Sequence, residues 1–189
     1  MKRIAILASG AGSNAANIID YFESKSVAEV VLIASNKSDA GVLQIAARHG
    51  VPTYILTKEN FRLGAEFIGV LKSLHVDFIV LAGFLWKVPS AMVAQFPQHI
   101  LNIHPSLLPK YGGKGMYGHF VHEAVHAARE KESGITVHWV NEHYDEGAII
   151  AQHRIEISES DSVVDIESKV RALEIKWFPR ILEEVLTTC

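Results

Sequence analysis

Cysteine is nearly missing from this sequence: its 189 residues include one, Cys189, at the last position. A single cysteine excludes a framework of internal disulfides, and its terminal position excludes a cysteine nucleophile in the body of the fold. Small secreted domains commonly depend on disulfides, whereas the cytoplasm keeps thiols reduced. We therefore expect a cytoplasmic protein.

Long apolar runs and an excess of positive charge are also missing. No stretch reaches the roughly 18 apolar residues that a membrane-spanning helix needs, so we expect no membrane association. The formal net charge is −3, which gives no electrostatic basis for binding nucleic acid or an anionic membrane. The first residues begin with Lys2 and Arg3 and a short apolar stretch, as signal peptides do. The glycines that follow Ala8 instead favour a first buried strand.

Apolar residues make up 49% of the chain and charged residues 21%, as in globular domains with a real core. Short runs rich in Val, Ile and Leu predict buried strands at residues 3–8, 29–35, 52–56 and 77–83. Helical spacing occurs between them, at residues 14–24, 39–50 and 60–76. This alternation predicts right-handed βαβ units and an α/β fold with a doubly wound, mostly parallel sheet, Rossmann-like in its N-terminal half.

The pattern changes after residue 98. A further strand at 99–103 precedes a helix at 118–132 and two strand-like runs at 133–140 and 147–157. The connection between these two runs is too short for a crossover helix, so we expect them to be antiparallel. The last helix, 162–186, contains Pro179, which predicts a bend or a restart there.

A glycine-rich loop follows the first strand. Residues 10–15, GAGSNA, match the G-x-G-x-x-A fingerprint, in which glycines let backbone amides approach a phosphate at a helix N-terminus. A dinucleotide site also requires an acidic residue after the second strand, and residues 34–37 contain none. Ser13 and Asn14 add side-chain donors, which favours a small terminal phosphate over NAD. The alternative is an ordinary tight turn capped by Ser13.

Residues 122–126, HEAVH, form an H-E-x-x-H pattern that places two imidazoles one helical turn apart, as in zinc peptidases. Residues 141–146, NEHYDE, offer a pattern for a third ligand. That ligand should come from a second helix, however, and this segment lies between two predicted strands. Such a short motif also arises easily by chance among ten histidines. We favour an amphipathic helix, with a zinc peptidase as the alternative.

A third group of polar residues comprises Asn102, His104 and Asp145. Asn102 and His104 are two apart on a strand, so their side chains leave the same face, at the end where doubly wound sheets bind ligands. A carboxylate near His104 would raise the pKa of the imidazole and hold it as a proton carrier, while Asn102 can donate to an oxyanion. Spacing alone leaves open whether Asp145 is near, and a structural histidine remains the alternative.

Five segments together resemble the folate-dependent formyltransferases, over nearly the whole chain. They are LASGAGSN (7–14), FIVLAGF (78–84), LNIHPSLLPKY (101–111), SGITVHWV (133–140) and Asp145-x-Gly147. The Asn-x-His-Pro-Ser-x-Leu-Pro pattern is specific to this superfamily, and the loop with Ser13 and Asn14 is similar to its phosphoribosylglycinamide formyltransferase branch. The resemblance implies a single formyltransferase domain, 1–189, with a phosphate-binding half (about 1–100) and a catalytic and folate-binding half (about 101–189).

The resemblance implies transfer of the formyl group of 10-formyltetrahydrofolate to the amine of 5-phosphoribosylglycinamide, in de novo purine biosynthesis. The products are formylglycinamide ribonucleotide and tetrahydrofolate. The family's catalytic positions fall on Asn102, His104 and Asp145, where His104 and Asn102 stabilise a tetrahedral oxyanion and Asp145 raises the pKa of His104. 10-Formyltetrahydrofolate is the co-substrate, and no metal is needed. We expect a monomer or a homodimer.

The resemblance also assigns binding positions. Those for the ribonucleotide are Gly12, Ser13, Asn14 and Glu174. Those for the folate are Arg62, Leu85, Trp86, Lys87, Val88, Asn102, Asn141, Glu142, His143, Tyr144 and Asp145. Two segments depart from the family pattern: residues 112–118, GGKGMYG, replace a shorter segment ending in Gly-Leu-His, and Trp86-Lys87 replaces Met-Arg. Lys114 and Tyr117 can therefore contact substrate.

Two other branches of the superfamily are alternatives. Methionyl-tRNA formyltransferases add a basic C-terminal RNA-binding domain, and formyltetrahydrofolate hydrolases add an N-terminal regulatory domain. With a first strand that begins near Lys2 and an acidic net charge, we expect neither.

Overall fold

The fold is built on one seven-stranded sheet with the order β3-β2-β1-β4-β5-β6-β7. The computed structural model describes residues 1–188, so Cys189 lies outside the described part. The strands are β1 (Lys2–Leu7), β2 (Ala28–Ser35), β3 (Thr53–Ile55), β4 (Phe78–Leu81), β5 (Ile100–His104), β6 (Glu132–Trp139) and β7 (Ile149–Glu156). β1 to β5 pair in parallel, while β6 and β7 join antiparallel. The predicted fold class is confirmed.

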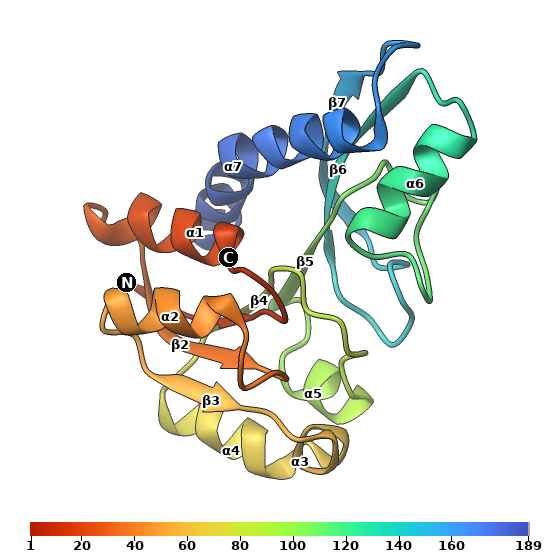
Figure 1. The fold of residues 1–189 in the computed structure, drawn as a ribbon. Coiled ribbons are helices and arrows are strands. Elements are labelled where there is room, and N and C mark those ends of the chain that lie inside the picture. Colours follow the sequence, from red (N-terminus) through yellow and green to blue (C-terminus); the bar gives the residue numbers. More distant parts are fainter. Residues whose placement is uncertain (189) are drawn as a thin grey trace.

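Helices cover both faces of the sheet (Figure 1). They are α1 (Ser13–Glu23), α2 (Gly41–Arg48), α3 (Lys58–Leu63), α4 (Ala65–Ser73), α5 (Ser90–Gln95), α6 (His119–Ala127) and α7 (Val163–Thr188). Buried side chains of α1, α2, α6 and α7 pack on one face, and those of α3, α4 and α5 on the other. β1 shows the cause: Ile4 and Ile6 face the first cluster while Ala5 and Leu7 face the second, because strand side chains alternate.

The helices differ from the sequence-based expectation in two places. The single helix expected at 60–76 is two, because Gly64 between α3 and α4 adopts φ 75°, a left-handed conformation that ends the helical path. α5 was not predicted from the sequence. Of the bend or restart expected at Pro179, the structure has the bend: α7 continues through Pro179, and Figure 1 shows the helix changing direction in its later half. The buried neighbours Phe178, Ile181 and Leu182 hold this segment in the core despite the lost backbone donor.

The carboxyl ends of the parallel strands place the polar segments side by side. β1 leads into the glycine loop and β4 into residues 82–88, and the two are tied by hydrogen bonds from Ser9 N to the Gly83 carbonyl (3.1 Å) and from Leu85 N to Ser9 Oγ (3.0 Å). β5 ends at His104 next to them. Among the described residues, no helix is both long and apolar enough to cross a membrane.

Candidate active site

A cavity of about 590 Å³ opens along this edge of the sheet. All three proposed catalytic residues line it, as do all four residues predicted to bind the ribonucleotide. Of the predicted folate-binding residues, Arg62 and Glu142 do not line the cavity; both side chains are exposed. Lys114 and Tyr117 of the unusual 112–118 segment do line it. The structure therefore brings nearly all of the predicted positions together in one place.

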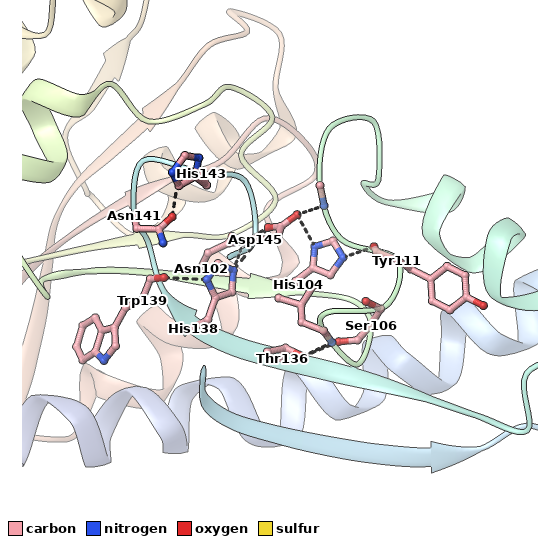
Figure 2. A network of polar contacts seen from close by, with 12 residues as sticks. Asn102, His104, Ser106, Tyr111, Thr136, His138, Trp139, Asn141, His143 and Asp145 are labelled. Atoms are coloured by element: carbon pink, nitrogen blue, oxygen red, sulfur yellow. Dashed lines mark hydrogen bonds and ion pairs between the residues drawn. The ribbon is translucent and has the colours of Figure 1, made fainter. Parts of the chain in front are cut away.

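The side chains of Asn102, His104 and Asp145 all line this cavity and lie close together (Figure 2). We call the part of the cavity that they line the Asn102–Asp145 end. Asp145 Oδ2 lies 3.6 Å from His104 Nδ1, and its Oδ1 lies 3.4 Å from Asn102 Nδ2. β5 thus directs both side chains to the same carboxylate, as the two-residue spacing predicted. The arrangement offers an amide donor, an imidazole and a carboxylate within one small volume.

His104 is buried between two acceptors. Its Nε2 lies 2.7 Å from the Tyr111 carbonyl oxygen, which can only accept, so Nε2 carries a proton. Burial lowers the pKa of His104, while Asp145 and the Tyr111 carbonyl oppose this by favouring the charged ring. Asp145 raises the pKa of His104, as predicted, but desolvation outweighs this effect and the net direction is downward.

Asp145 is held by the backbone as well as by its neighbours. Gly113 N donates to its Oδ2 at 2.9 Å, and Asp145 itself adopts φ 55°, a left-handed conformation in the β6–β7 connection. Burial raises the pKa of Asp145, but interactions with His138, His104 and the Gly113 N–H outweigh burial and lower it. The carboxylate is therefore ionised at neutral pH, beside a largely neutral His104.

His138 is the member of this group that sequence reasoning missed. It lies on β6 directly opposite Asn102, is 2% exposed, and its Nε2 is 3.1 Å from Asn102 Nδ2. The pattern of residues 133–140 held a signal: a histidine two positions after Thr136, so that both polar side chains leave the same face of a largely buried strand. The sequence alone does not show that β6 pairs with β5, so it could not show that His138 lies opposite Asn102.

The glycine loop forms the other end of the cavity. Gly12 is the N-cap of α1 with φ 82°, and a Cβ there would lie 2.7 Å from Val42 atoms, so the turn requires glycine. No side chain caps the helix, so the alternative of a Ser13 cap is wrong. The N-terminal amides of α1 therefore face the cavity edge without a side-chain acceptor, a geometry suited to an anion.

Asn14 and Glu174 join α1 to α7 beside that loop. Asn14 Nδ2 donates to Glu174 Oε2 at 2.9 Å, while Asn14 Oδ1 is buried without a hydrogen-bond partner. Burial raises the pKa of Glu174, and the bond from Asn14 only partly opposes this. The pair offers both an acceptor and a carboxylate to a ligand.

The H-E-x-x-H segment does not form a metal site. His122 is buried and lines the cavity, with its Nδ1 unpartnered, whereas His126 is exposed and does not line it. Glu167 on α7 instead pairs with His119 (3.0 Å) and Arg171 (3.2 Å). Within residues 1–188, no group of three or more His, Cys, Asp or Glu side chains is placed to hold a metal ion.

Comparison with known proteins identifies the family to which this chain is similar. The chain matches the Formyl transferase family over residues 2–182. It is 39% identical to phosphoribosylglycinamide formyltransferase of Haemophilus influenzae, covering 97% of this chain and 86% of that protein. It is 38% identical to the chloroplastic enzyme of that name from Arabidopsis thaliana, covering 96% of this chain. The chain spans 64% of the Arabidopsis protein and 60% of the Vigna unguiculata one.

The folds agree as closely as the sequences. The crystal structure of phosphoribosylglycinamide formyltransferase from Bacillus halodurans superposes with a TM-score of 0.90 at 34% identity, covering 98% of this chain and 95% of that one. The matched region includes both the glycine loop and the Asn102–Asp145 end of the cavity. The chain therefore belongs to the formyl transferase family, among the phosphoribosylglycinamide formyltransferases.

Proposed function

We propose that this protein transfers the formyl group of 10-formyltetrahydrofolate to the amine of 5-phosphoribosylglycinamide, a step of purine biosynthesis. The observation that carries the proposal is the convergence of Asn102, His104 and Asp145 on a cavity whose far end is a glycine loop at a helix N-terminus. One end suits acyl transfer and the other suits a phosphate. A single chain, 1–189, would supply both, with its first half binding phosphate and its second half carrying the chemistry.

The chemistry needs stabilisation of negative charge on the formyl oxygen as the amine attacks the formyl carbon. Asn102 can donate an N–H to that oxygen, and His104 can become the cation that balances it. Asp145 stabilises the imidazolium, because its carboxylate lies 3.6 Å from Nδ1 in a buried place. The proton that the amine loses ends on the folate nitrogen that leaves, so the reaction needs neither a redox partner nor a metal.

The glycine loop would hold the ribonucleotide. Gly12, Ser13 and Asn14 present the amides of the first turn of α1 to a phosphate, and its partial positive charge favours the anion. Glu174 would accept hydrogen bonds from the hydroxyl or amine groups of the same substrate. Binding at this end orients the amine toward the Asn102–Asp145 end.

The folate would occupy the part of the cavity between residues 85–88 and 141–145. Trp86 there packs on Phe61 of α3, with ring centroids 5.8 Å apart, and on Phe84 at 6.2 Å. Arg62 follows Phe61 and is exposed outside the cavity, where it can meet the anionic tail of a folate but not its pterin ring. Glu142 points to solvent, so we assign it no direct contact with the pterin.

The direct test mixes the protein with both substrates and follows release of tetrahydrofolate. We expect turnover that survives a metal chelator and falls to near background in His104→Ala. His126→Ala is the matched control, because His126 is exposed and outside the cavity, and it should retain full activity. Absence of turnover in the wild type, or unchanged turnover in His104→Ala, contradicts the proposal. Sedimentation of the active protein would distinguish a monomer from a homodimer.

A further inference from the structure

His138 holds one particular orientation of the Asn102 side chain, and the hydrogen bonds around its ring show how. The ring is buried on β6 and lines the cavity beside Asn102. Its two nitrogens have different neighbours: Nδ1 lies 2.9 Å from the Trp139 carbonyl oxygen, and Nε2 lies 3.1 Å from Asn102 Nδ2. The carbonyl oxygen has only lone pairs, so Nδ1 must carry a proton.

The other nitrogen must then be an acceptor. Asn102 Nδ2 also faces Asp145 Oδ1 at 3.4 Å, and an ionised carboxylate can only accept, so the amino group of Asn102 and not its carbonyl lies on this side. An amino group bonds to a nitrogen only if that nitrogen has a free lone pair. The 3.6 Å between His138 Nε2 and Asp145 Oδ1 is a longer, electrostatic contact, and Asn102 Nδ2 at 3.1 Å is the nearer partner that decides the state of Nε2.

This arrangement determines what Asn102 can present to the cavity. One amide hydrogen is used by His138 Nε2, and the second is held only by the long contact with Asp145. The second hydrogen is therefore the one available to an oxygen of a ligand. If the amide rotated by half a turn, it would present a carbonyl oxygen there, which repels negative charge instead of stabilising it.

We propose that His138, as the Nδ1–H tautomer, is a positioning residue that fixes the amide of Asn102 so that an N–H faces the reacting oxygen. The role rests on the proposed formyl transfer, because it acts on the group that stabilises the oxyanion. His138 touches no reacting atom itself, and its effect passes through Asn102.

The tautomer is tested first, without substrate. Long-range ¹H–¹⁵N NMR distinguishes a ring nitrogen that bears a proton from one that does not, and the His138→Gln spectrum identifies the His138 signals among the ten histidines. We expect a protonated Nδ1 and a bare Nε2. A proton on Nε2, with or without one on Nδ1, overturns the proposal.

Kinetics then test the consequence. In His138→Leu we expect kcat to fall about 10- to 100-fold, while the KM values of both substrates stay within about threefold, because the interaction lost is one made in the transition state. His138→Gln can place an amide oxygen near the former Nε2 position, so it should recover most of this loss. The same two changes at exposed His126 should have no effect.

A double-mutant cycle separates positioning from general damage to the fold. If His138 acts through Asn102, adding His138→Leu to the Asn102→Ala variant should lower kcat by less than about twofold. A full additive loss in that background, equal losses in the Leu and Gln variants, or a rise in KM alone overturns the proposal. Because NMR needs no substrate, failed turnover of the wild type contradicts the proposed function, whereas the wrong tautomer contradicts the role of His138. The Gln variant and the NMR result remain decisive if the Leu variant does not fold.

Discussion

The two ends of the cavity satisfy their polar groups differently. At the Asn102–Asp145 end, the carboxylate, both imidazoles and the amide each contact another protein group. At the glycine-loop end, Asn14 Oδ1 is buried without a hydrogen-bond partner. One end is complete within the protein, and the other still has an unmet hydrogen bond.

This difference fits a division of work. Groups that stabilise a transition state act best when the protein already holds them in place, because the reaction then needs no free energy to reorient them. Groups that bind a ligand can wait for the ligand to satisfy them, since an unmet buried polar atom costs about 1–3 kcal/mol that binding can recover. Changes at the first end should therefore alter kcat, and changes at the second should alter KM.

The largest effect is expected for Asp145→Asn. The amide cannot stabilise a charged His104, and its NH₂ group would repel either the Gly113 N–H or the amide of Asn102, which both donate to this carboxylate. We expect kcat to fall about 10³-fold or more, as when the carboxylate of a His–Asp pair is replaced, with little change in KM. Steady-state release of tetrahydrofolate measures both. If Asp145→Asn instead raised KM and left kcat unchanged, the proposed division between an end that affects kcat and an end that affects KM would be wrong.

The next effect, at the glycine-loop end, is expected for Glu174→Gln. The KM for the ribonucleotide should rise about 10- to 100-fold with kcat nearly unchanged, because a charged contact to the ligand is lost. Although the variant should bind the ribonucleotide more weakly, its folded state should be more stable than that of the wild type. Burial raises the pKa of Glu174, so the folded protein disfavours its charged form at neutral pH, and Gln removes that cost while still accepting from Asn14. Thermal unfolding at pH 7 should give a higher Tm for Glu174→Gln than for the wild type. A lower Tm would contradict the view that the buried site disfavours a charged Glu174.

Most of the sheet could be predicted from the sequence because its signals are local. Runs such as 29–35 and 77–83 are short and apolar on both faces, a pattern typical of strands in a parallel sheet that is covered on both sides. The break at Gly64 could not be predicted, since an isolated glycine is tolerated in many helices and only its φ shows the left-handed turn. The continuous path of α7 through Pro179 depends on tertiary packing, which no local pattern reports.

The site was less accessible to prediction than the fold. The two-residue spacing of Asn102 and His104 is a local signal, and the structure agrees with it. The approach of Asp145 and His138 depends on the antiparallel return of β6, which lies more than thirty residues later in the chain. The upward effect of Asp145 on the pKa of His104 could be predicted from its charge, whereas the net downward shift could not, because burial is a property of the whole fold.

A smaller effect concerns the pH dependence of stability, through two buried histidines that line the cavity, His104 and His122. Burial lowers the pKa of both His104 and His122 below the ordinary value of 6.5, so each folded ring resists protonation. As pH falls below about 6.5, the unfolded chain takes up protons that the folded rings refuse, and the free energy of unfolding decreases. Glu167 raises the pKa of His122, whereas His119, Arg171 and His104 lower it further.

Urea unfolding between about pH 7.5 and pH 5.5 measures this slope, to which each histidine contributes at most about a tenfold change in the unfolding constant per pH unit. His104→Gln and His122→Gln should each flatten the slope, because each removes a buried ring that resists protonation in the folded protein. Exposed His126→Gln is the control and should leave the slope unchanged. A slope of the opposite sign, or a slope that neither substitution changes, would contradict this expectation.

The smallest effect is expected outside both ends, at Arg62. Its side chain is exposed on α3, so a contact with the carboxylates of a folate tail is screened by water and salt. In Arg62→Ala, the KM for 10-formyltetrahydrofolate should rise by no more than about fivefold, with kcat and the KM for the ribonucleotide unchanged. The rise should be larger for a folate with several glutamates and smaller at high salt. Arg48→Ala, an equally exposed arginine on α2, is the control for net charge. An equal rise of this KM in both variants would show that Arg62 acts only through the overall charge of the protein. A fall in kcat in Arg62→Ala would show that Arg62 affects the chemical step, as residues of the Asn102–Asp145 end do.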